Sequence, residues 1–263
     1  MMDGLLERVG GWLVGLSEAM GEQALLVRSA FLWFGRSRLE AKQTVIQVLR
    51  IGVESVPLAI GCNLATGMVL ALETGSSFKH LFNEPVFTGT IVSYAVVKEL
   101  GPIMTALTVT GRAGAAIAAE LGTMKVTEQI DALYTLGTDP VRYLVIPRVA
   151  AFLVILPILT IFGDYAGVMG GSFVAAAKLG VPSSVYWREV FDNLGNKQFF
   201  HGLIKTFVFA FFISFICCYR GLSTKGGAEG VGKSTTSAVV ISMTAVLVVD
   251  YFVTAILVAL NIT

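Results

Sequence analysis

The sequence has little charge and little cysteine. Only 14% of its 263 residues are Asp, Glu, Lys or Arg, whereas ordinary soluble domains carry about 25%. This shortage excludes an ordinary soluble domain. The formal net charge of +1, with cations spread along the chain, provides no basic face and argues against a nucleic-acid partner.

The three cysteines, Cys62, Cys217 and Cys218, all lie in apolar segments. Two of them are adjacent, so we expect no disulfide framework and interpret all three as small buried hydrophobes. A cleavable signal peptide is not predicted, because the N-terminus carries acidic residues and the first long apolar run comes after residue 50.

Apolar residues, in contrast, make up 55% of the chain. Several runs reach about 18 residues, the length that crosses about 30 Å of hydrocarbon. We therefore predict an all-α integral membrane protein with five transmembrane helices, at about 51–72, 86–121, 143–177, 203–219 and 238–260. Prolines are expected to interrupt the first three of these spans, at positions Pro57, Pro102, Pro147 and Pro157.

Residues 1–42 are too polar to span a membrane. Apolar positions recur there at helical spacing between charged ones, and the region ends in a basic cluster, Arg36, Arg38 and Lys42. This pattern predicts an N-terminal interfacial helical region, with Trp and Phe toward the membrane and Arg toward water. A soluble helical hairpin is the alternative. A second interfacial helix is expected within the mixed segment 178–202.

The distribution of Lys and Arg predicts the orientation. With the N-terminus in the cytoplasm, thirteen basic residues fall on that side and four on the other, leaving Lys98 and Lys205 inside the membrane. The cytoplasmic excess favours a cytoplasmic N-terminus and a C-terminus on the opposite side.

Small residues recur at four-residue intervals in two spans, including Gly111, Ala115 and Ala119 in the second and Gly163, Gly167 and Gly171 in the third. Such faces let helices approach closely without a hydrophobic driving force. We expect these two spans to pack against protein rather than lipid.

The segment Gly227 to Ser234, GAEGVGKS, matches the phosphate-binding pattern G-x-x-x-x-G-K-[ST]. That pattern binds nucleotide only between a buried strand and a helix of a soluble sheet. Here an apolar span precedes it, and the aspartate that would partner it, Asp250, lies within the next span. We interpret the segment as a glycine-rich turn between two spans.

Ionisable residues inside spans are costly unless paired or hydrated, so each is a candidate functional residue. The sequence has six of them: Glu54, Lys98, Glu99, Asp164, Lys205 and Asp250. We expect Glu54 and Asp164 to lie near span ends and reach the interface. Lys98 and Glu99 precede Pro102, where a kinked helix has free carbonyl groups, and Lys205 and Asp250 could pair across helices.

A short helix is predicted in the connector between the second and third spans. Thr127 is its expected N-cap, Glu128 and Asp131 place negative charge in its first turn, and Gly137 ends it before Pro140. A helix of about ten residues on the basic side suits docking into a groove of a soluble partner. A membrane-surface helix with no partner is the alternative.

Several separated motifs resemble the MlaE (YrbE) permeases of ABC-type lipid transporters. They are KELGP at 98–102, GRAGAAIAAELGTMKVTEQIDAL at 111–133, GTDP at 137–140, PR at 147–148 and GVGKSTTSAVV at 230–240. The resemblance runs from about residue 45 to the C-terminus and implies a permease membrane domain at 43–263. The family usually has Arg before the glutamate of the first motif, where this chain has Lys98.

This resemblance implies a transport subunit without enzyme activity or a cofactor of its own, in the bacterial inner membrane. It implies a homodimer that binds phospholipid and acts in lipid asymmetry of the outer membrane. Its implied partners are a cytoplasmic P-loop ATPase (MlaF-like), which carries ATP and Mg, a periplasmic MCE-domain hexamer (MlaD-like) and often a STAS-domain protein (MlaB-like).

Site residues are implied in the same way. The lipid pathway would include Val69, Leu70, Lys98, Glu99, Lys205 and Asp250. The helix that couples to the ATPase would include Glu128, Gln129, Ile130, Asp131, Ala132 and Leu133. An ion- or proton-coupled secondary transporter that uses the buried carboxylates, and a membrane scaffold for peripheral proteins, are the alternative functions.

Overall fold

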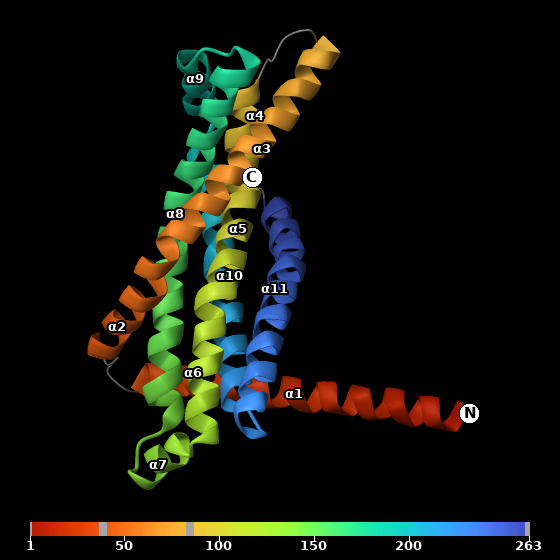
Figure 1. Cartoon of the computed structure of the whole chain (residues 1–263), viewed down its shortest axis with the longest axis vertical. Coiled ribbons are helices and arrows are strands. Elements are labelled where there is room, and N and C mark those ends of the chain that lie inside the picture. The colour runs from red at the N-terminus through yellow and green to blue at the C-terminus, as the bar shows by residue number, and fades with distance from the viewer. Residues whose placement is uncertain (1, 37–40, 83–86, 261–263) are drawn as a thin grey trace.

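The computed structural model describes residues 2–36, 41–82 and 87–260, and every regular element among them is a helix. Five helical segments are long and apolar enough to cross a membrane: Ala41–Lys79, Thr88–Val126, Val141–Leu179, Asn196–Leu222 and Gly227–Ala259. They stand roughly side by side in Figure 1. The prediction of an all-α membrane protein with five spans is confirmed. Each described span is longer than predicted. The second span nevertheless begins two residues later than predicted, and the fifth ends one residue earlier.

The first two spans are each built from several helical pieces. The first comprises α2 (Ala41–Gly52), a 3₁₀ turn η1 (Val53–Ser55) and α3 (Val56–Phe82). The second is α4 (Thr88–Ala95), α5 (Gly101–Val109) and α6 (Ala115–Val126), joined by two π-helical turns, η2 (Val96–Leu100) and η3 (Thr110–Gly114).

Proline explains where several of these changes of pitch fall. Pro102 is the second residue after η2. Pro147 is likewise the second residue after another π-helical turn, η4 (Val141–Val145). Proline has no N–H group and its ring crowds the preceding turn, so a wider turn there relieves the clash. Pro157 does not interrupt its helix, since α8 (Ile146–Val174) continues through it to a last π-helical turn, η5 (Ala175–Leu179).

The remaining helices include two short connectors. They are α7 (Gln129–Thr135), between the second and third spans, and α9 (Ser183–Asn193), between the third and fourth. The fourth and fifth spans are α10 (Asn196–Leu222) and α11 (Gly227–Ala259). The glycine-rich turn predicted at residues 227–234 is wrong, because the chain turns at 223–226 and GAEGVGKS forms the start of α11. A helix, not a strand, precedes it.

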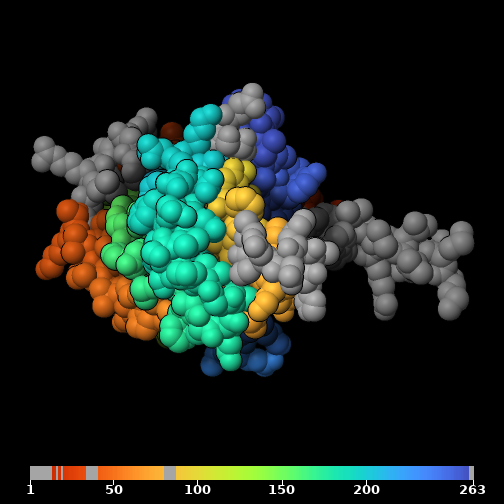
Figure 2. Space-filling model, turned by 90° about the horizontal axis from the view of Figure 1, so that it is seen from above, coloured from red at the N-terminus to blue at the C-terminus, as the bar shows by residue number. Residues whose placement is uncertain are grey.

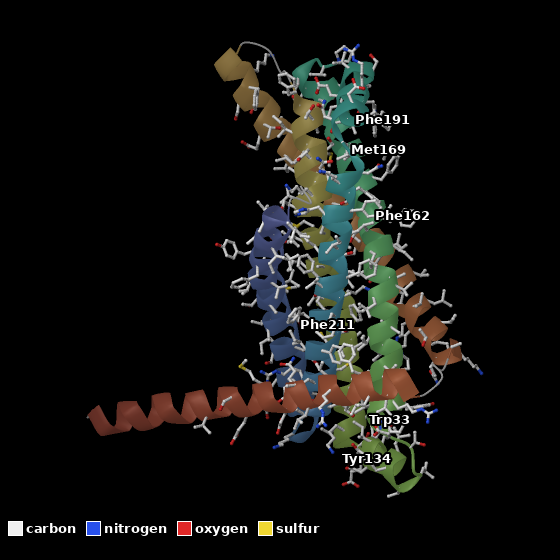
Figure 3. The ribbon with its side chains drawn as sticks, turned by 180° about the vertical axis from the view of Figure 1, so that it is seen from behind. Trp33, Tyr134, Phe162, Met169, Phe191 and Phe211 are labelled. Atoms are coloured by element: carbon white, nitrogen blue, oxygen red, sulfur yellow. The ribbon has the colours of Figure 1, made fainter. Side chains whose placement is uncertain are left out.

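The N-terminal helix α1 (Met2–Arg36) lies across one end of the spans rather than alongside them (Figures 1 and 3). Its direction suits an interfacial helix, and the predicted boundary at residue 42 falls in the first turn of α2. The side chains at 1–13, the side chain of Arg36 and the whole of Arg38 lie outside the described part of the chain. The location of this helix at a membrane surface stays a prediction.

The connectors sort to the two ends of the molecule. Helix α7 and the turn before α11 lie at the end that α1 crosses, whereas α9 and the last turns of α11 lie toward the other (Figure 1). Figure 2 shows this second end, where α9 and its neighbours cover much of the bundle. Tyr186 anchors α9, since its buried hydroxyl donates a hydrogen bond to the Val168 carbonyl oxygen at 3.1 Å.

Glycine lets two pairs of spans approach closely. A Cβ added to Gly67 of α3 would lie 1.9 Å from the carbonyl oxygen of Gly167 in α8, and one added to Gly170 would lie 2.6 Å from that of Leu64. A Cβ on Gly114 would lie 2.9 Å from Cys217 Sγ in α10. The predicted face of the third span, Gly163, Gly167 and Gly171, is buried against protein, as the sequence predicts. In the second span the buried small residues are instead Gly114, Ala118 and Gly122, whereas Gly111 is exposed and Ala115 and Ala119 are half-buried.

The α3–α8 contact can be tested at Gly67. A Gly67→Ala change forces the backbones apart, so we expect it to lower the free energy of unfolding by about 1–3 kcal/mol or more. Gly61→Ala is the matched control on the same helix, because Gly61 has open space around it. Thermal unfolding of the detergent-solubilised chain measures both, and equal stabilities would contradict the close contact.

Candidate functional site

A cluster of charged side chains joins the second, fourth and fifth spans. Lys205 of α10 is fully buried, and its ammonium group forms ion pairs with the Glu99 carboxylate of η2 and with Asp250 Oδ1 of α11, the latter at 2.9 Å. The sequence offered Lys205 and Asp250 as a cross-helix pair, and the structure brings them together. Glu99 completes the cluster from a third helix.

His201 adds a fourth polar group to this cluster. It lies one turn before Lys205 on α10, is fully buried, and places Nε2 3.8 Å from Glu99 Oε1. The Glu99 side chain is 32% exposed and that of Asp250 16%, whereas the lysine is sealed. The exposed edge of the cluster is therefore the carboxylate of Glu99.

Local backbone geometry explains why Glu99 meets α10. A Cβ on Gly202 would lie 2.2 Å from the carbonyl oxygen of Val97, so α10 touches the π-helical turn that carries Glu99. Lys98 is placed differently, with Nζ 5.4 Å from the centroid of the Tyr94 ring. Lys98 and Glu99 were expected to act together, but their side chains have different partners: only Glu99 joins the cluster.

Asp164 and Glu54 occupy different environments. We expected Asp164 near a span end, but α8 continues past it to Val174 and the side chain is buried, with Oδ1 packed against Gly101. The expectation for Asp164 is wrong. Glu54 is exposed and forms an ion pair of 2.5 Å with Arg112 of η3, so it links the first and second spans.

A second charge network, which the sequence did not reveal, lies nearer the α1 end. Buried Arg148 donates to Glu120 Oε1 at 2.9 Å, and Arg50 donates to the other oxygen of Glu120 at 2.8 Å. Arg112 donates through Nε to Ser55 Oγ and through a terminal nitrogen to the Arg50 carbonyl oxygen. Arg112 and Glu120 lie in the motif at 111–133, and Arg148 lies in the motif at 147–148. Membership of these motifs was the only sequence feature that pointed to the network.

The predicted wall residues Val69 and Leu70 face different ways. Leu70 packs against the buried cluster around Val92, whereas Val69 is 60% exposed on α3. Leu58 lies three turns earlier on the same stripe and lines a groove of about 440 Å³ between α3, α5 and α11. The other lining residues of that groove are Leu107, Thr108, Gly111, Arg112 and Met243.

The connector helix α7 is shorter than predicted and begins differently. Thr127 is not its N-cap, because the Thr127 hydroxyl bonds back to the Thr123 carbonyl oxygen and the residue ends α6. Glu128 occupies the cap position with a positive φ of 61°. Gly137, with φ of +71°, ends the connector as predicted.

The side chains of α7 divide into an anchored face and an exposed face. Ile130 is buried and Leu133 packs beside it, so both belong to the core. The exposed residues of the predicted set are Glu128, Gln129, Asp131 and Ala132. Beyond that set, Tyr134 is 60% and Leu136 78% exposed, and Tyr134 lies near the end of the molecule (Figure 3). Two large, exposed apolar side chains on one short connector are typical of a docking surface.

These features define a polytopic membrane transport subunit. A profile of the family described as Permease MlaE matches residues 44–256. The chain is 40% identical over 254 residues to a probable ABC transporter permease protein of Rickettsia bellii, which covers 97% of this chain and 98% of that protein. It is 37% identical over 227 residues to one of Synechocystis, covering 86% of each.

A third relative is a probable ABC transporter permease protein of Porphyra purpurea. It is 39% identical over 194 residues, which cover 74% of this chain and 73% of that protein. The chain therefore belongs to the MlaE permease family of ABC transporters. It is a permease subunit and not an enzyme.

The charge cluster makes a sharp prediction about stability. Lys205→Met leaves two partly buried carboxylates side by side without their cation, and we expect it to lower the free energy of unfolding by about 3 kcal/mol. Lys98→Met, the matched control, removes only a contact with Tyr94 and costs about 0.5–1 kcal/mol. Thermal unfolding in detergent compares them. If the two variants melt together, Lys205 does not hold the spans.

Proposed function

We propose that this permease moves phospholipid between the bacterial inner membrane and periplasmic MCE-domain proteins, driven by ATP hydrolysis in a partner. Two observations support this proposal: a largely apolar groove between α3, α5 and α11, and a partly exposed carboxylate, Glu99, in the same span as α5. A lipid has the same two parts, apolar chains and a charged headgroup. In this proposal the transporter maintains the lipid asymmetry of the outer membrane.

Two copies of the chain would enclose the lipid pathway. The first and fifth spans carry much exposed apolar surface, including Val69 and Leu72 on α3 and Leu247, Tyr251 and Phe252 on α11. Large exposed apolar surfaces mark interaction with protein or lipid. In a homodimer these faces would flank one apolar cavity, with Val69 in its wall and the headgroup near Lys98 and Glu99. Leu70 would support that wall from the core side, where it packs around Val92.

The second span offers a route for coupling. Helix α7 follows α6 after a short turn, and α6 continues through η3 and α5 to η2, where Glu99 lies. A displacement of α7 by the ATPase would travel along this one helical column to the charge cluster. The two π-helical turns interrupt the column, and such turns often occur at functional sites.

The proposed assembly has α7 and the N-terminus in the cytoplasm and the C-terminus in the periplasm. Two copies of a P-loop ATPase (MlaF-like) would bind ATP and Mg and dock on α7. An MCE-domain hexamer (MlaD-like) would cover the end that α9 occupies, and a STAS-domain protein (MlaB-like) would join the ATPase. Membership of an ABC permease family favours ATP over an ion gradient as the energy source.

Glu99 can be tested for a role in lipid binding. Glu99→Gln removes the charge from the exposed edge of the cluster, so we expect the phospholipid bound per purified chain to fall about tenfold, as loss of one charged hydrogen bond predicts. Glu73→Gln is the control, since Glu73 is exposed on α3 outside the cluster. Quantitative lipid mass spectrometry is the measurement. Unchanged lipid content in Glu99→Gln would contradict the pathway assignment.

The tip of α7 can be tested separately. We expect Tyr134→Ala combined with Leu136→Ala to weaken ATPase retention about tenfold or more, because exposed aromatic and apolar anchors dominate docking energy. The stability of the spans should not change, since both side chains point into water. Phe191→Ala, equally exposed at the opposite end, is the control. Full ATPase retention in the double variant would contradict docking on α7.

A further inference from the structure

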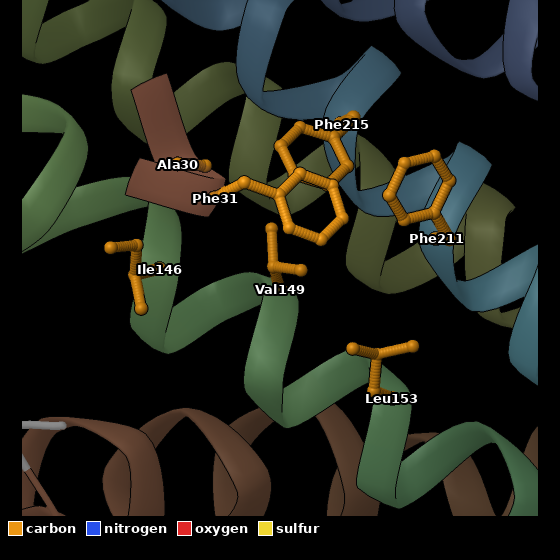
Figure 4. Close-up of a pocket in the computed structure, with 7 residues that line it drawn as sticks. All are labelled: Ala30, Phe31, Ile146, Val149, Leu153, Phe211 and Phe215. Atoms are coloured by element: carbon orange, nitrogen blue, oxygen red, sulfur yellow. The ribbon is translucent and has the colours of Figure 1, made fainter. Parts of the chain in front are cut away.

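An apolar cavity of about 130 Å³ lies where α1 crosses the spans, further along α10 than Lys205 of the charge cluster. Figure 4 shows its walls, with Phe31 from α1, Val149 and Leu153 from α8, and Phe211 and Phe215 from α10. Ala30 and Ile146 complete the lining, so every lining side chain is apolar. Two of the aromatic walls pack together, with the Phe211 and Phe215 centroids 4.8 Å apart.

The size and lining of this cavity indicate the kind of occupant. Cavities of about 150 Å³ lined by Leu, Ile and Phe stay dry and accept small apolar ligands. A helix, about 10–12 Å across with its side chains, is too wide for such a space. A hydrocarbon chain is narrow and apolar, and a membrane supplies it at high concentration.

The cavity also has room for the chain to continue. A second space of about 320 Å³ lies along α1 and shares Phe211 and Phe215 with the first. Its other lining residues are Met20, Gln23, Ala24 and Val27 of α1, Phe212 and Ile216 of α10 and Ala245 of α11, so all but Gln23 are apolar. The two largely apolar spaces therefore lie next to each other along α1, on either side of Phe211 and Phe215.

A cationic residue precedes the α8 part of the cavity lining by one helical turn. Ile146, Val149 and Leu153 recur along one face of α8, and Arg142 precedes Ile146 by one turn. The Arg142 guanidinium lies 5.8 Å from the centroid of the Trp33 ring, and Trp33 Nε1 donates to Asp139 Oδ2 at 3.0 Å. Arg142 is exposed, so its charge is available to an anion.

The length of this stripe matches one leaflet of a bilayer. Eleven residues separate Arg142 from Leu153, which is about 16 Å along a helix. Half of the hydrocarbon core is about 15 Å. A lipid phosphate at Arg142 would therefore place its chain beside Val149 and Leu153.

We propose that this cavity binds one acyl chain of a phospholipid, with the lipid phosphate at Arg142. The site is distinct from the Glu99, Lys205 and Asp250 cluster and does not depend on the proposed transport pathway. The bound chain fills the space between α1 and the spans. Because α1 is also tied to the connector through Trp33 and Asp139, the lipid holds α1 beside the loop that carries α7.

The test uses the full chain in nanodiscs of phosphatidylethanolamine and phosphatidylglycerol. A trace of phosphatidylethanolamine with a diazirine in its acyl chain is photoactivated, and labelled peptides are identified by mass spectrometry. The proposal predicts labels within 146–153 and 211–215. Leu153→Trp fills the cavity and should reduce those labels about tenfold, the loss expected when roughly two methylene groups leave an apolar site.

Val154→Trp is the matched control, because Val154 is the next residue on α8, does not line the cavity and is 50% exposed. It should leave the labels unchanged. Equal labelling in wild type, Leu153→Trp and Val154→Trp would show contact with bulk lipid only and overturn the site. No label in 146–153 or 211–215 would also overturn it.

Arg142→Gln gives a second test that does not disturb the core. It should reduce labelling by the phospholipid about tenfold, as loss of one charge-assisted contact predicts. Labelling by a diazirine diacylglycerol, which has no phosphate, should not change. A variant that affects both probes equally, or neither, would overturn the assignment of the phosphate to Arg142.

Discussion

The structure depends on keeping the Lys205 ammonium group paired inside an apolar bundle. An unpaired charge at the centre of a bilayer costs several kcal/mol, so the lysine requires its two carboxylates. These carboxylates lie on different helices, Glu99 in the second span and Asp250 in the fifth. The pairing therefore fixes the register of three spans at one level, and any movement of one span must carry the cluster with it or break it.

The backbone around the cluster is shaped to allow this pairing. Gly202 lets α10 touch η2 at Val97, and the π-helical turn places Glu99 toward the lysine and Lys98 toward Tyr94. Farther along the same span, Arg112 binds the first span and Glu120 binds Arg148 of the third span. Polar contacts thus tie the second span to its neighbours at several levels, and close glycine contacts at Gly114 and Gly202 hold the same span to α10.

Much of the fold could be predicted from the sequence, because apolar length and small-residue spacing depend on local pattern. The five spans, the close glycine faces and the short connector helix all follow from such patterns. The errors concern features that depend on neighbours. Asp164 was expected at a span end, but the third span extends beyond it. The segment at 227–234 contains three glycines, yet the fifth span begins there, because packing can override weak helix propensity.

The site was predictable only in part for the same reason. Ionisable residues within spans identified Glu99, Lys205 and Asp250, since buried charge is rare in membranes. Their meeting, the separate direction of Lys98 and the role of His201 depend on how α10 packs against η2. The ion pair between Arg148 and Glu120 could not be predicted from the sequence, although both residues lie in the motifs. A charged residue near a span end usually reaches water, so neither residue indicated a buried contact. The exposure of Tyr134 and Leu136 was also missed, because it depends on where α7 begins. The helix starts at Gln129, later than the sequence predicted.

The central claim is that this permease works on phospholipid together with an ATPase. The most direct test is gentle detergent extraction of the tagged chain from its own membranes, followed by identification of the proteins and lipids that co-purify. The account predicts a P-loop ATPase in stoichiometric amount and bound phospholipid. A chain that purifies alone, even after crosslinking in the membrane, would contradict it.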